Sequence, residues 1–187
     1  GVKIMLYSHQ EWDGKSDLRH TQLKKIDIED LLPRNQIEVD LEAIGKIFTG
    51  KCIMITGAAG SIGSEIVRQV ASFKPSQMIL IDQAETPLHD IRLMMMHKFA
   101  DIPALTLTAS ISHKCHMEAV FKEYKPDYVF HAAAYKHVPM MEDNPGEAVV
   151  NNIDGTRIIA DLAVKYKTKK FVMVSTDKAV NPTNVMG

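Results

Sequence analysis

Short apolar runs alternate with amphipathic stretches along the chain from Lys51 onward. A buried parallel strand is apolar on both faces and a surface helix on one face, so this alternation predicts successive strand–helix units. The expected strands are Cys52–Thr56, Gln77–Asp82, Ala104–Ala109, Asp127–His131 and Lys170–Ser175. The predicted fold class is therefore α/β: a Rossmann-like parallel sheet with helices on both faces. Its strand order is 3-2-1-4-5 if the first strand is central.

Four amphipathic stretches supply the connecting helices. In the first, Ile62, Ile66, Val67 and Val70 share one face, which we expect to be buried. The other three are expected to begin at capping residues or prolines: from Thr86 to about Phe99, from Ser112 through Tyr124, and from Asn144 to about Tyr166.

Residues 1–48 lack this alternation and form an N-terminal segment in our interpretation. We expect a short strand at residues 1–7 and a loop or weak helix at residues 8–25. A short helix is expected from Leu41 to Phe48, with Ile44 and Ile47 facing inward. The α/β domain is then expected to occupy residues 49–187.

The composition of the 187 residues is that of an ordinary soluble globular protein, with 45% hydrophobic and 24% charged residues. A net charge of −1 gives no electrostatic case for binding nucleic acid or an anionic membrane. There is no apolar run of about 18 residues, the length that suggests a membrane span. The two cysteines, Cys52 and Cys115, have no metal-like spacing, and we expect no metal and a reducing cytoplasm.

Three glycines follow the first strand, at Gly57, Gly60 and Gly63, and Ser61 and Ile62 open the helix between them. A strand, a glycine turn and a helix together form the layout that binds a dinucleotide. Gly57 permits the turn, Gly60 lets the backbone approach the phosphates, and Gly63 lets the helix pack closely. The free N–H groups at the helix start attract the pyrophosphate. A chance glycine turn is the alternative.

Asp82 ends the second strand and is followed by Gln83, at the position where an acidic residue binds the adenosine ribose of NAD. A 2′-phosphate there would face the carboxylate, and like charges ~4 Å apart repel by about 4 kcal/mol at an effective dielectric constant near 20. NAD is therefore favoured over NADP. The alternative is that Asp82 only caps a turn.

Four motifs in order resemble the polysaccharide-biosynthesis nucleotide-sugar 4,6-dehydratases, which belong to the extended short-chain dehydrogenase/reductase family. The matching stretches are Thr56–Gln69, His131–Pro145, Asn151–Thr156 and Val174–Gly187. The resemblance implies an NAD-dependent lyase that acts on UDP-N-acetylglucosamine or a related UDP-sugar in capsule, O-antigen or related glycan synthesis. It also implies a substrate domain beyond this chain and, in long members, N-terminal membrane helices.

The resemblance also assigns roles to residues after the fifth strand. Thr176 would bind the sugar 4-hydroxyl, Asp177 would be the general acid and Lys178 the base. Met186 stands where most members of the superfamily have a catalytic tyrosine, and a methionine cannot transfer a proton. The alternative to a catalytic role is that Ser175, Thr176 and Asp177 cap a helix and that Lys178 is a solvated lysine.

Further cofactor contacts are implied by the same resemblance. Ala132 and Ala133 would lie along the nicotinamide, and Lys136 would reach the cofactor or the substrate. Ser110 and Ile111 occupy the place of an Asp-Ile or Asp-Val pair that reads the adenine, so Ser110 would bind it more weakly.

Three functional hypotheses remain open from the sequence. The first is the cofactor half of a UDP-sugar 4,6-dehydratase that ends before its substrate domain and is inactive alone, or of an epimerase on the same scaffold. The second is a non-catalytic NAD-binding module. The third is a purely structural domain, against which the glycine pattern argues. An exposed sheet edge also suggests a homo-oligomer.

Overall fold

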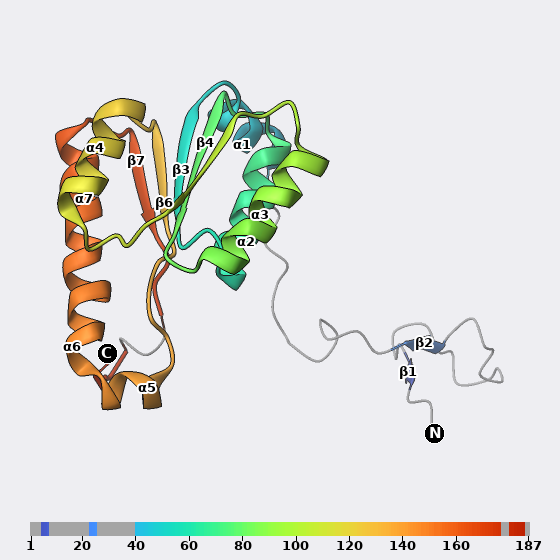
Figure 1. The fold of residues 1–187 in the computed structure, drawn as a ribbon. Helices are drawn as coiled ribbons and strands as arrows, with labels where there is room; N and C mark the ends of the chain where they lie inside the picture. The colour runs from blue at the N-terminus through green and yellow to red at the C-terminus, as the bar shows by residue number, and fades with distance from the viewer. Residues whose placement is uncertain (1–4, 8–22, 26–39, 177–179, 186–187) are drawn as a thin grey trace. The chain divides into compact units, whose positions relative to one another are not determined.

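The computed structural model describes residues 5–7, 23–25, 40–176 and 180–185 (Figure 1). The chain divides into two compact units, Gly1–Asp40 and Leu41–Gly187. In the first unit, β1 (Met5–Tyr7) pairs with β2 (Leu23–Lys25) in an antiparallel ladder. The expectation of a loop or weak helix was wrong for residues 23–25, where pairing across the chain outweighs local preference. The helix α1 (Leu41–Phe48), which we predicted within the N-terminal segment, lies in the second unit.

The second unit is built on a five-stranded parallel sheet of order β5-β4-β3-β6-β7. This is the predicted order 3-2-1-4-5, with the strand before the glycines at the centre. The strands are β3 (Cys52–Thr56), β4 (Gln77–Asp82), β5 (Ala104–Thr108), β6 (Tyr128–His131) and β7 (Lys170–Met173). In β3, Ile53 pairs with Met78 of β4 and with Tyr128 of β6.

Helices cover both faces of this sheet, as predicted (Figure 1). The described helices of this unit are α1, α2 (Ser61–Ser72), α3 (Glu85–Lys98), α4 (Lys114–Tyr124), α5 (Val138–Asp143), α6 (Pro145–Ala148), the π-helix η4 (Val149–Gly155) and α7 (Thr156–Lys165). The helices α2 and α3 pack on one face, and α4 and α7 pack on the other.

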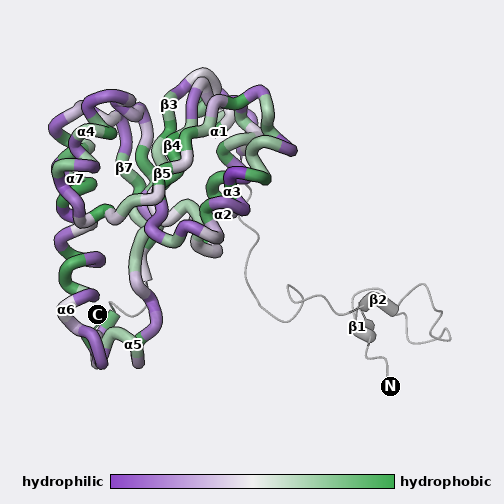
Figure 2. Tube along the Cα trace, viewed as in Figure 1, coloured by the Kyte–Doolittle hydropathy of each residue, from purple (hydrophilic) through white to green (hydrophobic). Residues whose placement is uncertain are grey.

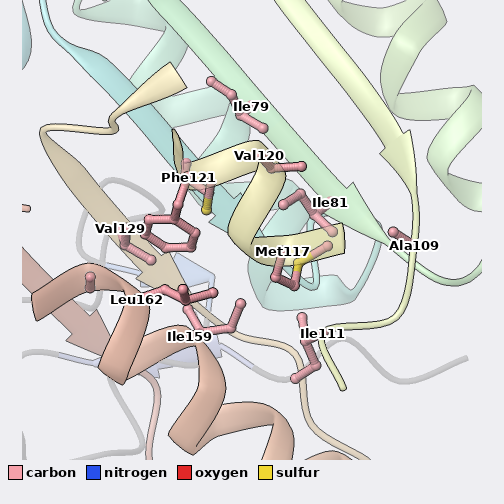
Figure 3. Close-up of a cluster of buried hydrophobic side chains, with 12 residues drawn as sticks. Ile79, Ile81, Ala109, Ile111, Met117, Val120, Phe121, Val129, Ile159 and Leu162 are labelled. Atoms are coloured by element: carbon pink, nitrogen blue, oxygen red, sulfur yellow. The ribbon is translucent and has the colours of Figure 1, made fainter. Parts of the chain in front are cut away.

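Alternate residues of β3 belong to the two cores. Ile53 and Ile55 pack with α2 and α3, whereas Met54 packs with α4 and α7. Figure 3 shows the second core, in which Phe121 of α4 and Ile159 of α7 are both fully buried against the sheet. Figure 2 shows hydrophobic residues concentrated on the strands and on the sides of the helices that face them. The continuous apolar runs of β3 and β4 are therefore explained by burial on both faces.

Two buried positions predicted from helical periodicity were wrong. Ile47 of α1 is 44% exposed, and Phe48 packs instead, with its ring 5.4 Å from that of Tyr128 and 5.7 Å from that of Phe130. Ile62 is 55% exposed because it lies in the first turn of α2, where Gly63 makes the contact with the strand. Periodicity predicts which face is apolar but not where the contact with the sheet begins.

Helix starts also differ from the prediction. The N-cap of α3 is Ala84, not Thr86, and that of α4 is His113, not Ser112. The Ser112 hydroxyl lies 2.8 Å from the hydroxyl of Ser110. The long helix expected from Asn144 is divided into α6, η4 and α7, and α5 was not predicted. None of the helices in the described part of the chain combines the length and apolar composition that crossing a membrane requires.

Candidate functional site

A cleft of about 320 Å³ opens at the carboxyl ends of β3, β4 and β6. The chain passes from β3 to β4 and β5 on one side and then returns to β6 on the other, so the cleft lies where the strand order reverses. Parallel α/β sheets bind ligands at such a point. The lining residues are Gly57, Ala59, Gly60, Ile81, Asp82, Gln83, Ala84, Pro87, Ala109, Ser110, Ile111, Ala132, Ala133, Ala134, Tyr135 and Asn151.

Gly57 forms the sharp turn that leaves β3. Its φ of +69° is in the left-handed region, which favours glycine. An added Cβ would lie only 2.5 Å from the carbonyl oxygen of Ala132, so β6 also leaves no room for a side chain. The turn therefore needs glycine for two independent reasons.

Gly63 brings α2 against this turn. A Cβ at this position would lie 1.8 Å from the carbonyl oxygen of Gly57, a separation that no structure tolerates. Gly60 is different, because its Cβ would meet only the Gly57 oxygen at 3.4 Å, which is an ordinary contact. The described part of the chain therefore accommodates a side chain at Gly60, and any need for glycine there comes from a molecule in the cleft.

The first turn of α2 begins at the floor of the cleft. Gly60 is the N-cap, and among the described residues no side chain bonds the free N–H groups of this turn. Ser61 and Ile62 follow, and both side chains are exposed. Free N–H groups at a helix start, next to a glycine loop, form a favourable place for a phosphate.

Asp82 links the glycine loop to the next helix. Its Oδ2 atom accepts the backbone N–H of Ala59 at 2.9 Å, and its Oδ1 atom accepts that of Ala84 at 2.9 Å. The alternative interpretation of Asp82 as a turn cap thus describes a real contact. It does not compete with a role toward a ligand, because each carboxylate oxygen has a second lone pair.

Small residues after β6 form the opposite wall of the cleft. They follow His131, which is 3% exposed and lies between the hydroxyls of Thr56 and Thr156, at 2.7 Å from Nδ1 and 2.9 Å from Nε2. Burial lowers the pKa of His131 to about 4, so its ring is neutral near pH 7. Ala132 and Ala133 line the cleft directly beyond this anchored ring.

Two predicted residues, Ser110 and Ile111, lie at the β5 side of the cleft. The Ser110 hydroxyl is bonded to the side chain of Ser112 and accepts its backbone N–H at 3.3 Å. Ile111 is buried beside Gly155, where an added Cβ would lie 2.7 Å from the Ile111 Cδ1 atom. Ile111 therefore also fixes the position of η4.

The remaining predicted residues fall outside this cluster. Gly63 is buried beneath the loop, Lys136 is exposed and does not line the cleft, and Thr176 is exposed beyond the end of β7. Asp177, Lys178 and Met186 lie outside the described residues. Eight of the twelve cofactor candidates therefore line the cleft, whereas Ser61, Ile62, Gly63 and Lys136 do not, and the roles of the catalytic candidates stay predictions.

Sequence reasoning missed three polar residues at this site. Tyr135 and Asn151 line the cleft. The third residue, Asn152, makes two hydrogen bonds with the backbone of Tyr135: its Oδ1 atom accepts the Tyr135 N–H at 2.8 Å, and its Nδ2 atom donates to the Tyr135 carbonyl at 3.0 Å. The asparagine pair was visible as a motif. Its role depends on η4, from which Asn152 bonds the loop after β6 and Asn151 bonds Asn152, and periodicity gives no signal for this.

The chain matches the family model described as "Polysaccharide biosynthesis protein" over residues 53–187. The capsular polysaccharide biosynthesis protein CapD of Staphylococcus aureus is 44% identical over 188 residues, which cover 100% of this chain and 31% of that protein. The UDP-N-acetylglucosamine 4,6-dehydratase (inverting) of Campylobacter jejuni is 32% identical over 75% of this chain and 41% of its own length. The chain thus spans well under half the length of these curated relatives.

Among solved structures, Pen from Bacillus thuringiensis superposes with a TM-score of 0.70 and 33% sequence identity. The match covers 75% of this chain and 43% of that one.

Proposed function

The chain belongs to the polysaccharide biosynthesis protein family, and on that basis we propose that it forms the NAD-binding part of a nucleotide-sugar 4,6-dehydratase. The observation that carries this proposal is the cleft itself, in which a glycine turn, an open helix start and Asp82 meet at the reversal of strand order. The names of the relatives support the substrate class, a UDP-sugar such as UDP-N-acetylglucosamine.

The residues present fit a dinucleotide. The N–H groups around Gly60 and the first turn of α2 would hold its phosphates, and the open space at the Gly60 Cβ position supports this. Asp82 and Gln83 would bind the adenosine ribose, and this carboxylate favours NAD over NADP. Ala132 and Ala133 would leave room for the nicotinamide.

Catalysis in this proposal depends on the residues that follow β7. NAD would supply a hydride acceptor for the sugar C4 and return the hydride at C6. Thr176 would orient the 4-hydroxyl, whose proton would pass to solvent as the hydride leaves C4. Lys178 would take the C5 proton and return it when the hydride adds at C6, and Asp177 would protonate the leaving C6 hydroxyl. Met186 would stand beside them without transferring a proton.

A titration calorimetry experiment tests the cofactor assignment. We expect saturable binding of NAD and weaker binding of NADP. Asp82→Ala is a poor probe, because it also removes the acceptor of the Ala59 N–H. Gly60→Ala is better: the added methyl fits the fold but projects where the phosphates approach, so NAD affinity should fall about tenfold.

Gly146→Ala is the matched control, because a Cβ at that position meets nothing within 4 Å. It should leave NAD affinity unchanged. If neither dinucleotide binds the wild-type protein, or if Gly60→Ala binds NAD as tightly as the wild type, the cleft is not the dinucleotide site that we propose.

A further inference from the structure

A side-chain hydrogen bond joins the two sides of the cleft. Gln83 Nε2 donates to the Tyr135 hydroxyl at 2.9 Å, and both residues line the cleft. Gln83 follows the end of β4, whereas Tyr135 lies in the loop after β6, 52 positions later in the chain. The central strand β3 lies between these two strands, so the bond crosses the point where the strand order reverses.

Tyr135 is held firmly at its backbone. The side-chain amide of Asn152 accepts its N–H and donates to its carbonyl, which is the pairing that a neighbouring strand would provide. The Oδ1 atom of Asn152 also accepts Nδ2 of Asn151 at 2.9 Å, and Asn151 is 7% exposed. The loop after β6 is therefore fixed to η4, and the hydroxyl of Tyr135 is presented at a defined place.

The other end of the bond is equally well anchored. Gln83 directly follows Asp82, whose two oxygens accept the N–H groups of Ala59 and Ala84. Neither Gln83 nor Tyr135 belongs to either hydrophobic core. The bond thus joins two hydrogen-bonded segments across the cleft and is not part of either hydrophobic core.

We infer that Gln83 and Tyr135 form a bridge that retains the bound dinucleotide and slows its release; this inference rests on the proposed function. A dehydratase that returns the hydride to the same sugar needs its dinucleotide to stay in place throughout the cycle. Release midway would leave the sugar as a 4-ketone. A bridge between the two sides of the cleft, formed by side chains that can part and rejoin, meets this need.

Stopped-flow displacement of NAD from the full chain tests the bridge. Tyr135→Phe removes only the hydroxyl and keeps the ring, so we expect the dissociation rate constant of NAD to rise about fivefold, the factor for one neutral hydrogen bond. The association rate constant should change little. Tyr166→Phe is the matched control, because it removes a hydroxyl that bonds Glu118 rather than the cleft, and its NAD kinetics should equal those of the wild type.

A double-mutant cycle separates the bridge from direct contacts with the dinucleotide. If the bond itself retains NAD, Gln83→Ala should raise the dissociation rate constant, and Tyr135→Phe should add little in the Gln83→Ala background. Unchanged dissociation in Tyr135→Phe, or fully additive effects, would overturn the bridge while NAD binding by the wild type still supports the proposed function. Absence of NAD binding by the wild type would overturn both.

Discussion

His131 shows how one buried side chain joins the sheet to a helix behind the cleft. Its two ring nitrogens bond hydroxyls from β3 and α7, and its ring stacks on Phe171 of β7 with 5.8 Å between centroids. The three groups that make these contacts with the ring are all uncharged. The neutral form is therefore the one that the folded protein favours.

This preference makes stability depend on pH. The pKa of His131 is about 4 in the folded protein and 6.5 in an unfolded chain, so the unfolded state binds the proton more readily. The contribution is fully present above pH 6.5 and is lost as the pH falls toward 4, by about 3 kcal/mol between pH 7 and pH 4. Urea unfolding at several pH values measures this loss.

His131→Gln is the comparison, because an amide can bond hydroxyls but does not titrate. The variant should be less stable than the wild type at pH 7 and should lose less stability on acidification. Parallel stability curves for the two proteins would show that His131 is not responsible for the acid sensitivity.

At the scale of elements, α2 packs closely on the glycine turn, and among the glycines that the structure describes Gly63 leaves the least room for a Cβ atom. Gly63→Ala would place a methyl group 1.8 Å from the Gly57 oxygen, so α2 has to move away from β3. Such crowding costs typically about 1–3 kcal/mol and occasionally more. We expect a loss of free energy of unfolding of at least about 2 kcal/mol, measured by urea denaturation, together with weaker NAD binding.

Gly146→Ala again serves as the control. Its added methyl is unopposed and lies in a helix, where alanine is favoured over glycine by roughly 0.5–1 kcal/mol, so stability should stay equal or rise slightly. A Gly63→Ala protein as stable as the wild type would mean that the turn and α2 separate more easily than the structure indicates.

The strands that the sequence predicts correctly are those marked by short, nearly continuous apolar runs. The five strands and their order follow from apolar runs such as that of β4 and from the glycine turn after β3. The start of α3 does not, because the Asp82 carboxylate holds the N–H of Ala84 and places the N-cap before the expected threonine. The π-helix η4 depends on contacts made only after folding, including that between Gly155 and Ile111.

The residues of the candidate site also fall into two groups, those that the sequence predicts and those that it does not. Glycine spacing and the acid after β4 predict residues that meet in the cleft, because backbone constraints leave few alternatives there. Tyr135 was missed because an isolated tyrosine carries no positional signal, and its place is set by Asn152 from a distant segment. The roles of Asp177, Lys178 and Met186 remain predictions.

At the scale of the whole molecule, this chain covers 31% of the length of CapD and 41% of that of the Campylobacter jejuni dehydratase. The proposed reaction is therefore tested on the full-length protein. We expect the full-length protein to convert UDP-N-acetylglucosamine to a product lighter by one water, detectable by mass spectrometry. Asp177→Asn should lower turnover by about 100-fold or more, because general acid catalysis contributes that much, while NAD affinity is retained.

Asp90→Asn makes the same substitution at an exposed position of α3 outside the cleft, so it serves as the control and should keep most of the activity. A product of unchanged mass would indicate an epimerase, the alternative that the sequence left open. Full activity of Asp177→Asn would remove that residue from the mechanism.

The two hydrogen bonds that the Asp82 carboxylate accepts also bear on how the proposed cofactor preference could change. The carboxylate that would repel a 2′-phosphate is the same group that secures the glycine loop through Ala59 and the start of α3 through Ala84. A substitution that removed this charge to admit NADP would also remove the acceptor of at least one of these two N–H groups. On the proposed function, a change of cofactor preference at this position would therefore also weaken the anchoring of the glycine loop or of the start of α3.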